Sequence, residues 1–416
     1  MSFSKKAAEL IDWVRVCYDW NKMDILPVWV LDSARLNPKR PVQSEGVTAF
    51  LQNEVGIRSA VVIPTSGSSG EAKFVVLSKH AILASARAVN IHCGIEANDR
   101  WLGGLSTFHV GGLGIYARAS CNGAEVVPMP WENWRRDGGP LLDAITTTGA
   151  TLTSLTPVHL CDLVRAGADA PESLRMVFLG GGRVEKSLVD RARSLGWPIR
   201  VTYGMSEAAS QIATGQGDEI DCLPVLASWE CREGPDFRLQ IRGEALFSGY
   251  TRREGERWIY VPSQNDKGWF TTGDRCEVSD GSLRFIERAD DAVKVSGELV
   301  SLSGLQARLD ALGISGVIVA VPEERRGNEL VLVVEGDGNA ARDQLNTNLP
   351  YVEQVSRVVS MNELPRTDLG KLDLATIRKA IDGERSQIST SPNPQAEPRL
   401  ARADLKTKDS GASGST

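Results

Sequence analysis

Short apolar runs alternate with amphipathic segments through the first half of the chain. After a run at 61–63, further runs predict strands at 74–77, 101–105, 124–127, 151–155, 176–179 and 199–202. Apolar residues at helical spacing predict helices between them, at 79–92, 157–165 and 185–195. Ser78 is placed to cap the first helix. This alternation predicts an α/β fold with a mostly parallel sheet covered by helices, in which ligands bind at the carboxyl ends of the strands.

The pattern changes after Asp221, where short alternating stretches with turn signals predict a small antiparallel module. Residues 276–285 predict a hairpin, because Asp280-Gly281 at their centre favours a tight turn. A small α+β region follows, and then a tail rich in Ser, Pro, Gly, Asp and Lys, which is typical of disorder. We therefore expect three parts, at 1–288, 289–380 and 381–416.

The loop after the first apolar run combines small residues, hydroxyls and a lysine, in the order Thr65-Ser66-Gly67-Ser68-Ser69-Gly70-Glu71-Ala72-Lys73. Glycine lets backbone N–H groups approach an anion, the hydroxyls add donors, and Lys73 adds a mobile positive charge, which together suit a triphosphate. The spacing is not that of a Walker A loop, and the loop alone also fits a Gly/Ser surface turn. Glycine-bearing loops at 180–182 and 203–207 also follow apolar runs. We expect all three loops to meet at the carboxyl ends of the strands.

Composition and charge narrow the function classes. The 416 residues are 42% hydrophobic and 24% charged, as in globular proteins of two or three domains. A formal net charge of −6 without a basic block argues against nucleic acid and anionic membranes as partners. No apolar run reaches the roughly 18 residues of a membrane span. Seven dispersed cysteines without a CxxC pair indicate reduced thiols in a cytoplasmic protein. Four histidines without metal-pair spacing argue against structural zinc.

Five stretches carry a family resemblance when they are taken in order. They are 65–73, Tyr203-Gly204-Met205-Ser206-Glu207, Gly268-Trp269-Phe270-Thr271-Thr272-Gly273-Asp274, Arg288-Ala289-Asp290-Asp291-Ala292-Val293-Lys294-Val295-Ser296-Gly297 and Pro365-Arg366-Thr367-Asp368-Leu369-Gly370-Lys371. Over about residues 60–375 the chain resembles the adenylate-forming superfamily, which includes acyl- and aryl-CoA ligases, luciferases and peptide-synthetase adenylation domains. Any one stretch is weak, but five in the family's order make coincidence an unsatisfactory explanation.

Within the superfamily the chain is most similar to the o-succinylbenzoate–CoA ligases of menaquinone and phylloquinone biosynthesis. The similarity rests on Phe108-His109-Val110-Gly111-Gly112-Leu113, on Leu179-Gly180-Gly181-Gly182, and on 203–207 running into Ser210-Gln211-Ile212-Ala213-Thr214. It implies a large N-terminal domain that binds ATP and the acid, and a small mobile C-terminal domain with a catalytic lysine. The implied cofactors are ATP and Mg²⁺, with coenzyme A as co-substrate and an aromatic carboxylic acid as partner. The sequence leaves monomer and homodimer both open.

The resemblance also implies roles for individual residues. The nucleotide-binding set comprises Thr65, Ser66, Gly67, Ser68, Ser69, Gly70, Lys73, Gly180, Gly181, Gly182, Tyr203, Gly204, Met205, Ser206, Asp274 and Arg288. In this set the first loop grips the β- and γ-phosphates, 180–182 and Tyr203 flank the adenine, and Asp274 accepts hydrogen bonds from the ribose. Glu207 holds Mg²⁺, a hard cation that prefers oxygen ligands. Lys371 brings positive charge to the reacting phosphate and carboxylate.

Asp290 falls at the family's hinge position, so that the small domain rotates between two states. One state presents Lys371 to ATP. The other brings the loop that holds Lys294, Ser296 and Gly297 to the acyl-adenylate for attack by the CoA thiol.

Each of these residues also has a purely structural interpretation. Glu207 fits a helix N-terminus, and Asp274 and Lys371 fit ordinary loops. His109 either contributes to the acyl site or is a core histidine. The chain also departs from the family, with only about 60 residues before the first loop, Ala72 in place of proline and Glu287 in place of glycine.

Three other functions therefore stay open. They are another acyl- or aryl-CoA ligase, a stand-alone adenylation enzyme, and a nucleotide-binding relative without catalysis.

Overall fold

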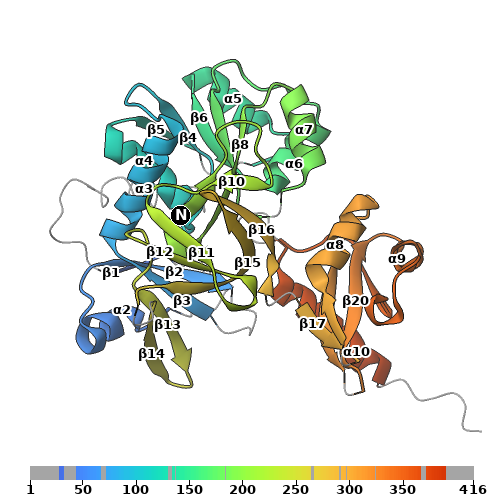
Figure 1. Cartoon of the computed structure of the whole chain (residues 1–416). Helices are drawn as coiled ribbons and strands as arrows, with labels where there is room; N and C mark the ends of the chain where they lie inside the picture. The colour runs from blue at the N-terminus through green and yellow to red at the C-terminus, as the bar shows by residue number, and fades with distance from the viewer. Residues whose placement is uncertain are drawn as a thin grey trace, which may run out of the picture.

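The computed structural model describes residues 28–31, 44–66, 72–129, 134–135, 137–182, 184–263, 267–289, 292–296, 298–323, 325–366 and 372–389. Within this part of the chain, a six-stranded sheet has the order β5-β4-β6-β7-β8-β9 (Figure 1). Its strands are β4 (Arg100–Gly103), β5 (Glu125–Pro128), β6 (Leu152–Leu155), β7 (Met176–Leu179), β8 (Ile199–Met205) and β9 (Ser210–Thr214). All are parallel except β9, which pairs antiparallel with β8. The predicted α/β fold with a mostly parallel sheet is confirmed.

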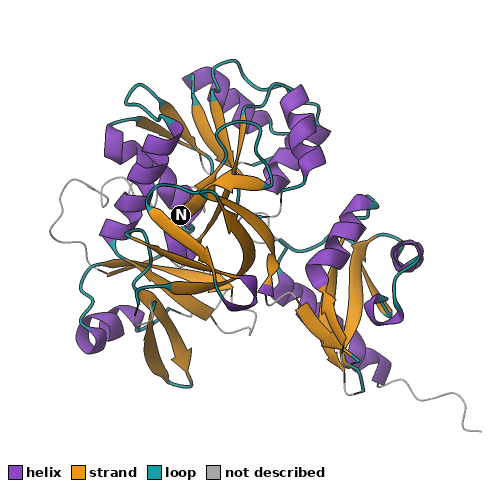
Figure 2. Cartoon of the chain, in the orientation of Figure 1, coloured by secondary structure: helices purple, strands orange, loops and turns teal. Residues whose placement is uncertain are grey.

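Helices cover this sheet on both sides, with α3 and α4 on one side and α6 and α7 on the other (Figure 2). They are α3 (Lys79–Cys93), α4 (Val110–Asn122), α5 (Gly139–Thr148), α6 (Pro157–Arg165) and α7 (Lys186–Ser194). Ser78 caps α3 as predicted, since its side chain accepts a hydrogen bond from the backbone N–H of Ala81. The sequence did not predict α4, which contains Gly111, Gly112 and Gly114. Close packing requires the second of these, because a Cβ at Gly112 would collide with the carbonyl of Ser106.

A second sheet has the order β1-β2-β3-β13-β14. Its strands are β1 (Val28–Val30), β2 (Ala60–Ser66), β3 (Ala72–Leu77), β13 (Gly249–Glu254) and β14 (Arg257–Pro262). The short helix α2 (Val47–Phe50) continues into a π-helical turn, Leu51–Val55, and packs on this sheet. β2 and β3 form an antiparallel hairpin. The prediction that the loop at 65–73 follows a strand of the parallel sheet is therefore wrong. Pairing of β3 with the distant β13 places this hairpin in a different sheet.

A third sheet forms the predicted antiparallel module, in the order β10-β16-β15-β12-β11. Its strands are β10 (Cys222–Pro224), β11 (Trp229–Glu233), β12 (Arg238–Gly243), β15 (Phe270–Ser279) and β16 (Ser282–Arg288). The 3₁₀ turns Ser206–Ala208 and Pro235–Phe237 precede β9 and β12. The hairpin at Asp280-Gly281 is confirmed, since both residues have positive φ, 50° and 73°.

The last part of the described chain has its own hydrophobic clusters, formed by residues between 293 and 381. Its strands are β17 (Ala292–Val295), β18 (Glu298–Ser301), β19 (Gly316–Glu323), β20 (Gly327–Glu335) and β21 (Arg357–Met361). Its helices are α8 (Leu302–Ala311), α9 (Gly338–Asn346) and α10 (Leu374–Ser389), with a 3₁₀ turn at Tyr351–Glu353. Helix α10 continues past residue 380, where the sequence predicted the tail to begin. Ile377 and Ile381, one helical turn apart, are fully buried and hold this helix on β19–β21.

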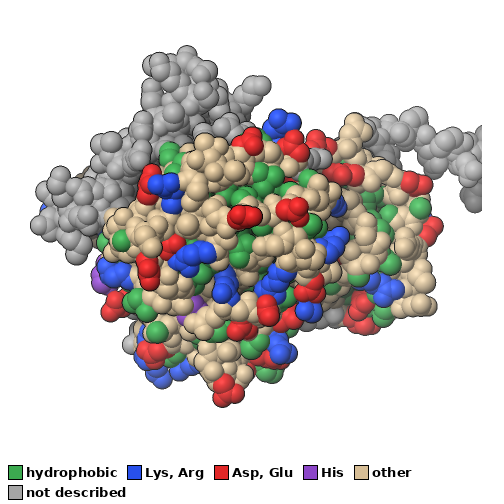
Figure 3. All heavy atoms as spheres, turned by 90° about the horizontal axis from the view of Figure 1, so that it is seen from above, with side chains coloured by type: hydrophobic (Ala, Val, Ile, Leu, Met, Phe, Trp, Pro, Cys, Tyr) green, Lys and Arg blue, Asp and Glu red, His purple; other side chains and the backbone are tan. Residues whose placement is uncertain are grey.

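The surface seen in Figure 3 carries acidic and basic side chains that are interspersed, without a large patch of one sign. In the part of the chain that the structure describes, no helix combines the length and apolar character needed to cross a membrane.

Candidate active site

The loops after β7 and β8 lie side by side, because these two strands are parallel neighbours. Gly180 is packed against Thr202 so closely that a Cβ would collide with the threonine hydroxyl. Gly204 is similarly tight, since a Cβ there would collide with the carbonyl of Ser210 on β9. Both glycines therefore allow backbone contacts that no other residue permits. The sequence placed 180–182 and 203–207 at one edge of the parallel sheet, and the structure brings them together there.

Glu207 lies in the 3₁₀ turn that follows β8. Its Oε1 accepts a hydrogen bond of 2.6 Å from the hydroxyl of Tyr250 on β13, and its carbonyl accepts one of 2.9 Å from the backbone N–H of Phe247. The ammonium nitrogen of Lys73 lies 3.2 Å from the centre of the Tyr250 ring. Burial raises the pKa of Tyr250 and the nearby Glu207 carboxylate raises it further, so the hydroxyl stays a donor at neutral pH. Lys73 and Glu207, from different sheets, thus contact the same tyrosine.

A second set of polar side chains joins β8 to the antiparallel module. The Tyr203 hydroxyl donates a 2.6 Å hydrogen bond to Oδ2 of Asp274, and Nη1 of Arg288 lies 3.0 Å from Oδ1 of the same carboxylate. Oδ1 accepts no hydrogen bond from the described residues, although Asp274 is only 5% exposed. Burial raises the pKa of Tyr203 well above its usual value, and the Asp274 carboxylate raises it further. Asp274 therefore bridges Tyr203 and Arg288, and its Oδ1 meets Arg288 as an ion pair without hydrogen-bond geometry.

The predicted phosphate loop is described only at its two ends. Thr65 Oγ1 donates a 3.1 Å hydrogen bond to the carbonyl of Lys73, its partner across the β2–β3 hairpin. Ser66 and Ala72 form the last described pair of the ladder. The predicted phosphate ligands Gly67, Ser68, Ser69 and Gly70 lie outside the described residues.

The remaining predicted residues fall at separate places. His109 is the N-cap of α4, although its side chain does not cap the helix. Ser296 has a left-handed φ of 53°, and its backbone N–H donates a 2.7 Å hydrogen bond to the carbonyl of Arg326. Lys294 lies on β17. Asp290, Gly297 and Lys371 lie outside the described residues, so their roles stay predictions.

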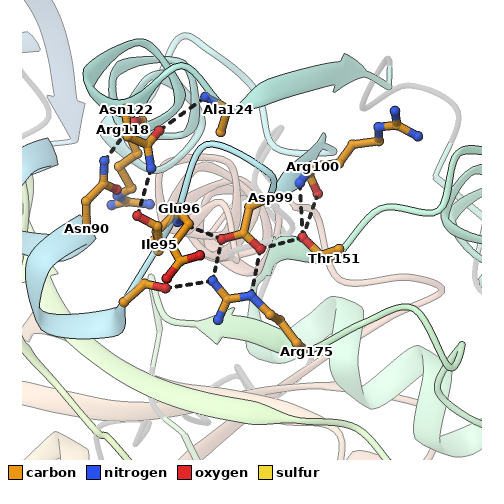
Figure 4. A network of polar contacts seen from close by, with 11 residues as sticks. Asn90, Ile95, Glu96, Asp99, Arg100, Arg118, Asn122, Ala124, Thr151 and Arg175 are labelled. Carbon is orange, nitrogen blue, oxygen red and sulfur yellow. Dashed lines mark hydrogen bonds and ion pairs between the residues drawn. The ribbon is translucent and has the colours of Figure 1, made fainter.

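Arg118 on α4 was missed by the sequence analysis. It is 2% exposed and lies over the rings of Trp101 and Phe178. Its Nη2 donates a 2.9 Å hydrogen bond to Ser210 Oγ, while its Nε has no partner among the described residues. Figure 4 shows its carbonyl accepting a hydrogen bond from Asn90. Burial lowers the pKa of Arg118 to about 10. The sequence signal that could have revealed it is that Arg118 is the one charged residue of α4, whose other residues are mostly small or apolar.

Tyr250 was also missed, because it stands in an ordinary strand pattern and is distinguished only by what it contacts. Glu287, which stands in place of the family's glycine, makes contacts that link β16 to neighbouring elements. It accepts hydrogen bonds of 2.7 Å from Arg275 and 2.9 Å from Ser301, the N-cap of α8.

The donor set near Glu207 suits a cation that arrives with phosphate. In the described ranges, no three His, Cys, Asp or Glu side chains gather to form a metal site. Mg²⁺ is commonly held by one or two carboxylates together with substrate phosphates and water. Glu207 fits that arrangement, because Tyr250 engages only its Oε1 and the carboxylate has further lone pairs for a cation.

Comparisons with known proteins bear on this geometry. Residues 21–229, half of the chain, match the model of the AMP-binding enzyme family. A 2-succinylbenzoate–CoA ligase from Bacillus cytotoxicus is 27% identical over 86% of this chain and 76% of the relative. An E. coli MenE variant solved with bound OSB-AMS is 26% identical, with a TM-score of 0.64 over 77% of this chain and 68% of that one. The Bacillus subtilis o-succinylbenzoate coenzyme A synthetase solved with ATP and magnesium is 23% identical, with a TM-score of 0.63 over 75% and 68%, and its likeness concerns the fold.

The expected resemblance to adenylate-forming enzymes is confirmed by the family match, which covers the parallel sheet with its glycine loops and Glu207. The stretches at 268–274 and 365–371, which include Asp274 and the predicted catalytic lysine, lie beyond the matched residues. The chain belongs to the AMP-binding enzyme family.

Proposed function

We propose that this chain is an ATP-dependent acid–CoA ligase whose acid is 2-succinylbenzoate, the compound in the names of its relatives. The observation that carries the proposal is the meeting of two polar sets from three sheets. Lys73 and Glu207 share Tyr250, and Tyr203 shares Asp274 with Arg288. The first set offers a cation and a carboxylate for Mg²⁺ and phosphates. The second offers an aromatic ring and a carboxylate for a nucleoside.

The chemistry has two steps. A carboxylate oxygen of the acid attacks the α-phosphorus of ATP, the bond to the β-phosphate breaks, and pyrophosphate leaves. The CoA thiol, as its thiolate, then attacks the carbonyl carbon of the acyl-adenylate and AMP leaves with the electron pair. Catalysis in the first step is mainly positioning and charge stabilisation, which Lys73, Glu207 and Lys371 would supply. Asp274 would orient the ribose, and the backbone at 180–182 would lie against the adenine.

Arg118 supports the choice of acid. A buried guanidinium is strongly disfavoured unless a carboxylate or several acceptors compensate it. Among the described residues, its side chain donates a hydrogen bond to Ser210, which faces Met205 across the β8–β9 ladder. 2-Succinylbenzoate keeps one carboxylate after the other has joined AMP. The proposal assigns that remaining carboxylate to Arg118, which benzoate or a fatty acid would leave unpaired.

The second step requires the predicted small domain at 289–380. Under the proposal it rotates about Asp290, withdraws Lys371 and brings the Lys294–Gly297 loop to the adenylate, as the family resemblance implies. The separate hydrophobic clusters of residues 293–381 support a boundary near 288. A cytoplasmic location is part of the same proposal, because the described cysteines are free thiols.

The deciding experiment measures pyrophosphate release with 2-succinylbenzoate, benzoate, a fatty acid and an amino acid, each with and without CoA. We expect release with 2-succinylbenzoate that exceeds release with benzoate by roughly 100-fold, as loss of a charged contact implies. Addition of CoA should yield AMP and the thioester. Release with another acid alone would reassign the substrate. Adenylate without thioester would indicate a stand-alone adenylation enzyme, and no release with any acid would indicate a non-catalytic relative.

A further inference from the structure

Tyr250 contacts both Lys73 and Glu207. The register of β3 and β13 explains the first contact. Tyr250 lies opposite Val75 and Arg252 lies opposite Lys73, so Tyr250 and Lys73 are diagonal neighbours on one face of the sheet. Their side chains can therefore meet without any displacement of the backbone.

The ring of Tyr250 is itself held by aromatic packing. Phe247 contacts it edge-on with centroids 4.6 Å apart, and Phe270 lies 6.3 Å away. Phe247 also donates its backbone N–H to the carbonyl of Glu207. The tyrosine and the turn that carries Glu207 are thus fixed against each other by backbone and side-chain contacts together.

We propose that Tyr250 is a positioning residue for the nucleotide-binding site: its hydroxyl orients the Glu207 carboxylate for the metal, and its ring face holds the Lys73 ammonium for the phosphates. The inference rests on the proposed function. By occupying Oε1, the hydroxyl restricts the rotamers of Glu207 and leaves the other carboxylate oxygen for a cation. The ring attracts the ammonium through its negative face without neutralising it, so that the lysine keeps its charge.

The two contacts are separable by substitution. Tyr250→Phe removes the hydroxyl and keeps the ring, whereas Tyr250→Leu removes both. Tyr260→Phe is the matched control, because this tyrosine on the neighbouring strand donates a 2.8 Å hydrogen bond to the Ser248 carbonyl and contacts neither Lys73 nor Glu207 in the described contacts. Tyr250→Met replaces the leucine variant if that variant does not fold.

The test measures ATP binding by calorimetry, once in EDTA and once with Mg²⁺, alongside thermal unfolding. For Tyr250→Phe we expect ATP affinity in EDTA within about twofold of the wild type, and a Mg²⁺-dependent gain in affinity reduced about tenfold, as loss of a hydrogen bond to a charged group implies. For Tyr250→Leu we expect affinity in EDTA to fall a further roughly fivefold, as loss of a cation–π contact implies. Tyr260→Phe should match the wild type in both titrations.

Each of the following outcomes would overturn part or all of the inference. An unchanged Mg²⁺ gain in Tyr250→Phe would remove the hydroxyl's role, and equal EDTA affinities in the phenylalanine and leucine variants would remove the ring's role. A parallel loss of affinity and unfolding temperature in all variants, including Tyr260→Phe, would show a general structural effect. If the wild type itself binds no ATP, the proposed function fails and the inference fails with it. If the wild type binds ATP and forms adenylate while the variants behave alike, the inference fails alone.

Discussion

The two ends of the six-stranded sheet use polar side chains in opposite ways. At the amino ends of β4, β6 and β7, Asp99, Thr151 and Arg175 form a closed network (Figure 4). Asp99, 5% exposed, accepts from both side chains and from the backbone N–H of Glu96, and Arg175 also donates to the carbonyl of Gly94.

Around the carboxyl ends of the strands, the buried polar side chains have fewer hydrogen-bond partners among the described residues. Arg118 has an Nε without a partner among the described residues, and Asp274 Oδ1 is engaged only by the ion pair with Arg288, without a hydrogen bond of good geometry. Native proteins satisfy nearly all buried polar groups, so a group with spare capacity suggests a ligand. The comparison suggests a test of whether saturation, rather than charge or burial, separates structural polar groups from functional ones. Lack of a partner alone does not assign a function, because Trp101 Nε1 and Asn90 Oδ1 also have no hydrogen-bond partner among the described residues.

The largest effect should come from Asp274→Asn. Two charge-assisted hydrogen bonds to the ribose, each worth about 2 kcal/mol, would be weakened, which corresponds to roughly a 10³-fold loss in kcat/KM for ATP. The unfolding temperature should also fall, because the 3.0 Å ion pair with Arg288 is lost, although the asparagine can still accept from Tyr203; the exchange rate is therefore compared at a temperature where both proteins are folded. ATP–pyrophosphate exchange and thermal unfolding measure the two quantities. Asp280→Asn, in the exposed turn of the same hairpin, is the control. Unaltered exchange would show that Asp274 is as structural as Asp99.

The opposite result is expected for Asp99→Asn. Removal of the charge of the buried Asp99, whose partner Arg175 is partly exposed, should lower the free energy of unfolding by about 2 kcal/mol and leave kcat/KM of the folded enzyme unchanged. Asp190→Asn is the control, because its 3.5 Å pair with Lys186 is exposed and contributes little. Denaturant unfolding and pyrophosphate exchange decide the matter. A large loss of activity without loss of stability would break the distinction between the two ends.

The same variant makes a prediction about pH. Burial raises the pKa of Asp99, but the hydrogen bonds from Arg175, Glu96 and Thr151 outweigh burial and leave the pKa below its usual value. A carboxylate whose folded pKa is depressed stabilises the fold above its unfolded pKa of about 3.9, and this contribution disappears as the pH falls through the folded pKa. The stability difference between wild type and Asp99→Asn should be constant near pH 7 and shrink below about pH 4. A difference that grows with acidification would contradict this sign.

Arg118→Met should separate function from stability in a third way. We expect KM for 2-succinylbenzoate to rise about 30-fold, since a buried charged contact worth about 2 kcal/mol is lost. The unfolding temperature should stay the same or rise, because replacing a buried charge with an apolar side chain of similar size removes a desolvation cost. Arg165→Met, on the exposed end of α6, is the control. A drop in stability with KM unchanged would place Arg118 among the structural groups.

The sequence predicted those parts of the fold that depend on local pattern. The apolar runs at 74–77, 151–155, 176–179 and 199–202 became strands because each is short and at least half of its residues are buried. Helix α4 was not predicted, since its glycines have low helix propensity and tertiary packing decides its conformation. The sheet that holds the β2–β3 hairpin depends on a long-range pairing, that of β3 with β13, which no local pattern encodes.

The site residues likewise fall into those that the sequence can reveal and those that only the folded structure reveals. Glu207 and Asp274 stand in ordered motifs that a sequence can reveal, and the structure brings each to a distinct aromatic partner. Tyr250 and Arg118 stand in unremarkable strand and helix patterns. Their importance comes from contacts with residues of other sheets and with β9, which exist only after the chain has folded.

The smallest effect is expected at Glu287, which lies near Asp274. Like Asp99, it has a hydrogen-bond partner on each carboxylate oxygen, which we call saturated. It pairs with Arg275 and accepts from Ser301 at the start of α8, so it ties β16 to the small C-terminal part. If saturation marks a structural group, Glu287→Gln should lower the free energy of unfolding by about 1 kcal/mol and change adenylation less than about twofold. Glu277→Gln, from an exposed 3.6 Å pair on the same hairpin, is the control. Pyrophosphate release and thioester formation from supplied acyl-adenylate should be measured separately. A selective gain or loss in thioester formation would mean that Glu287 controls the movement of the small part, and saturation would then no longer identify a group as purely structural.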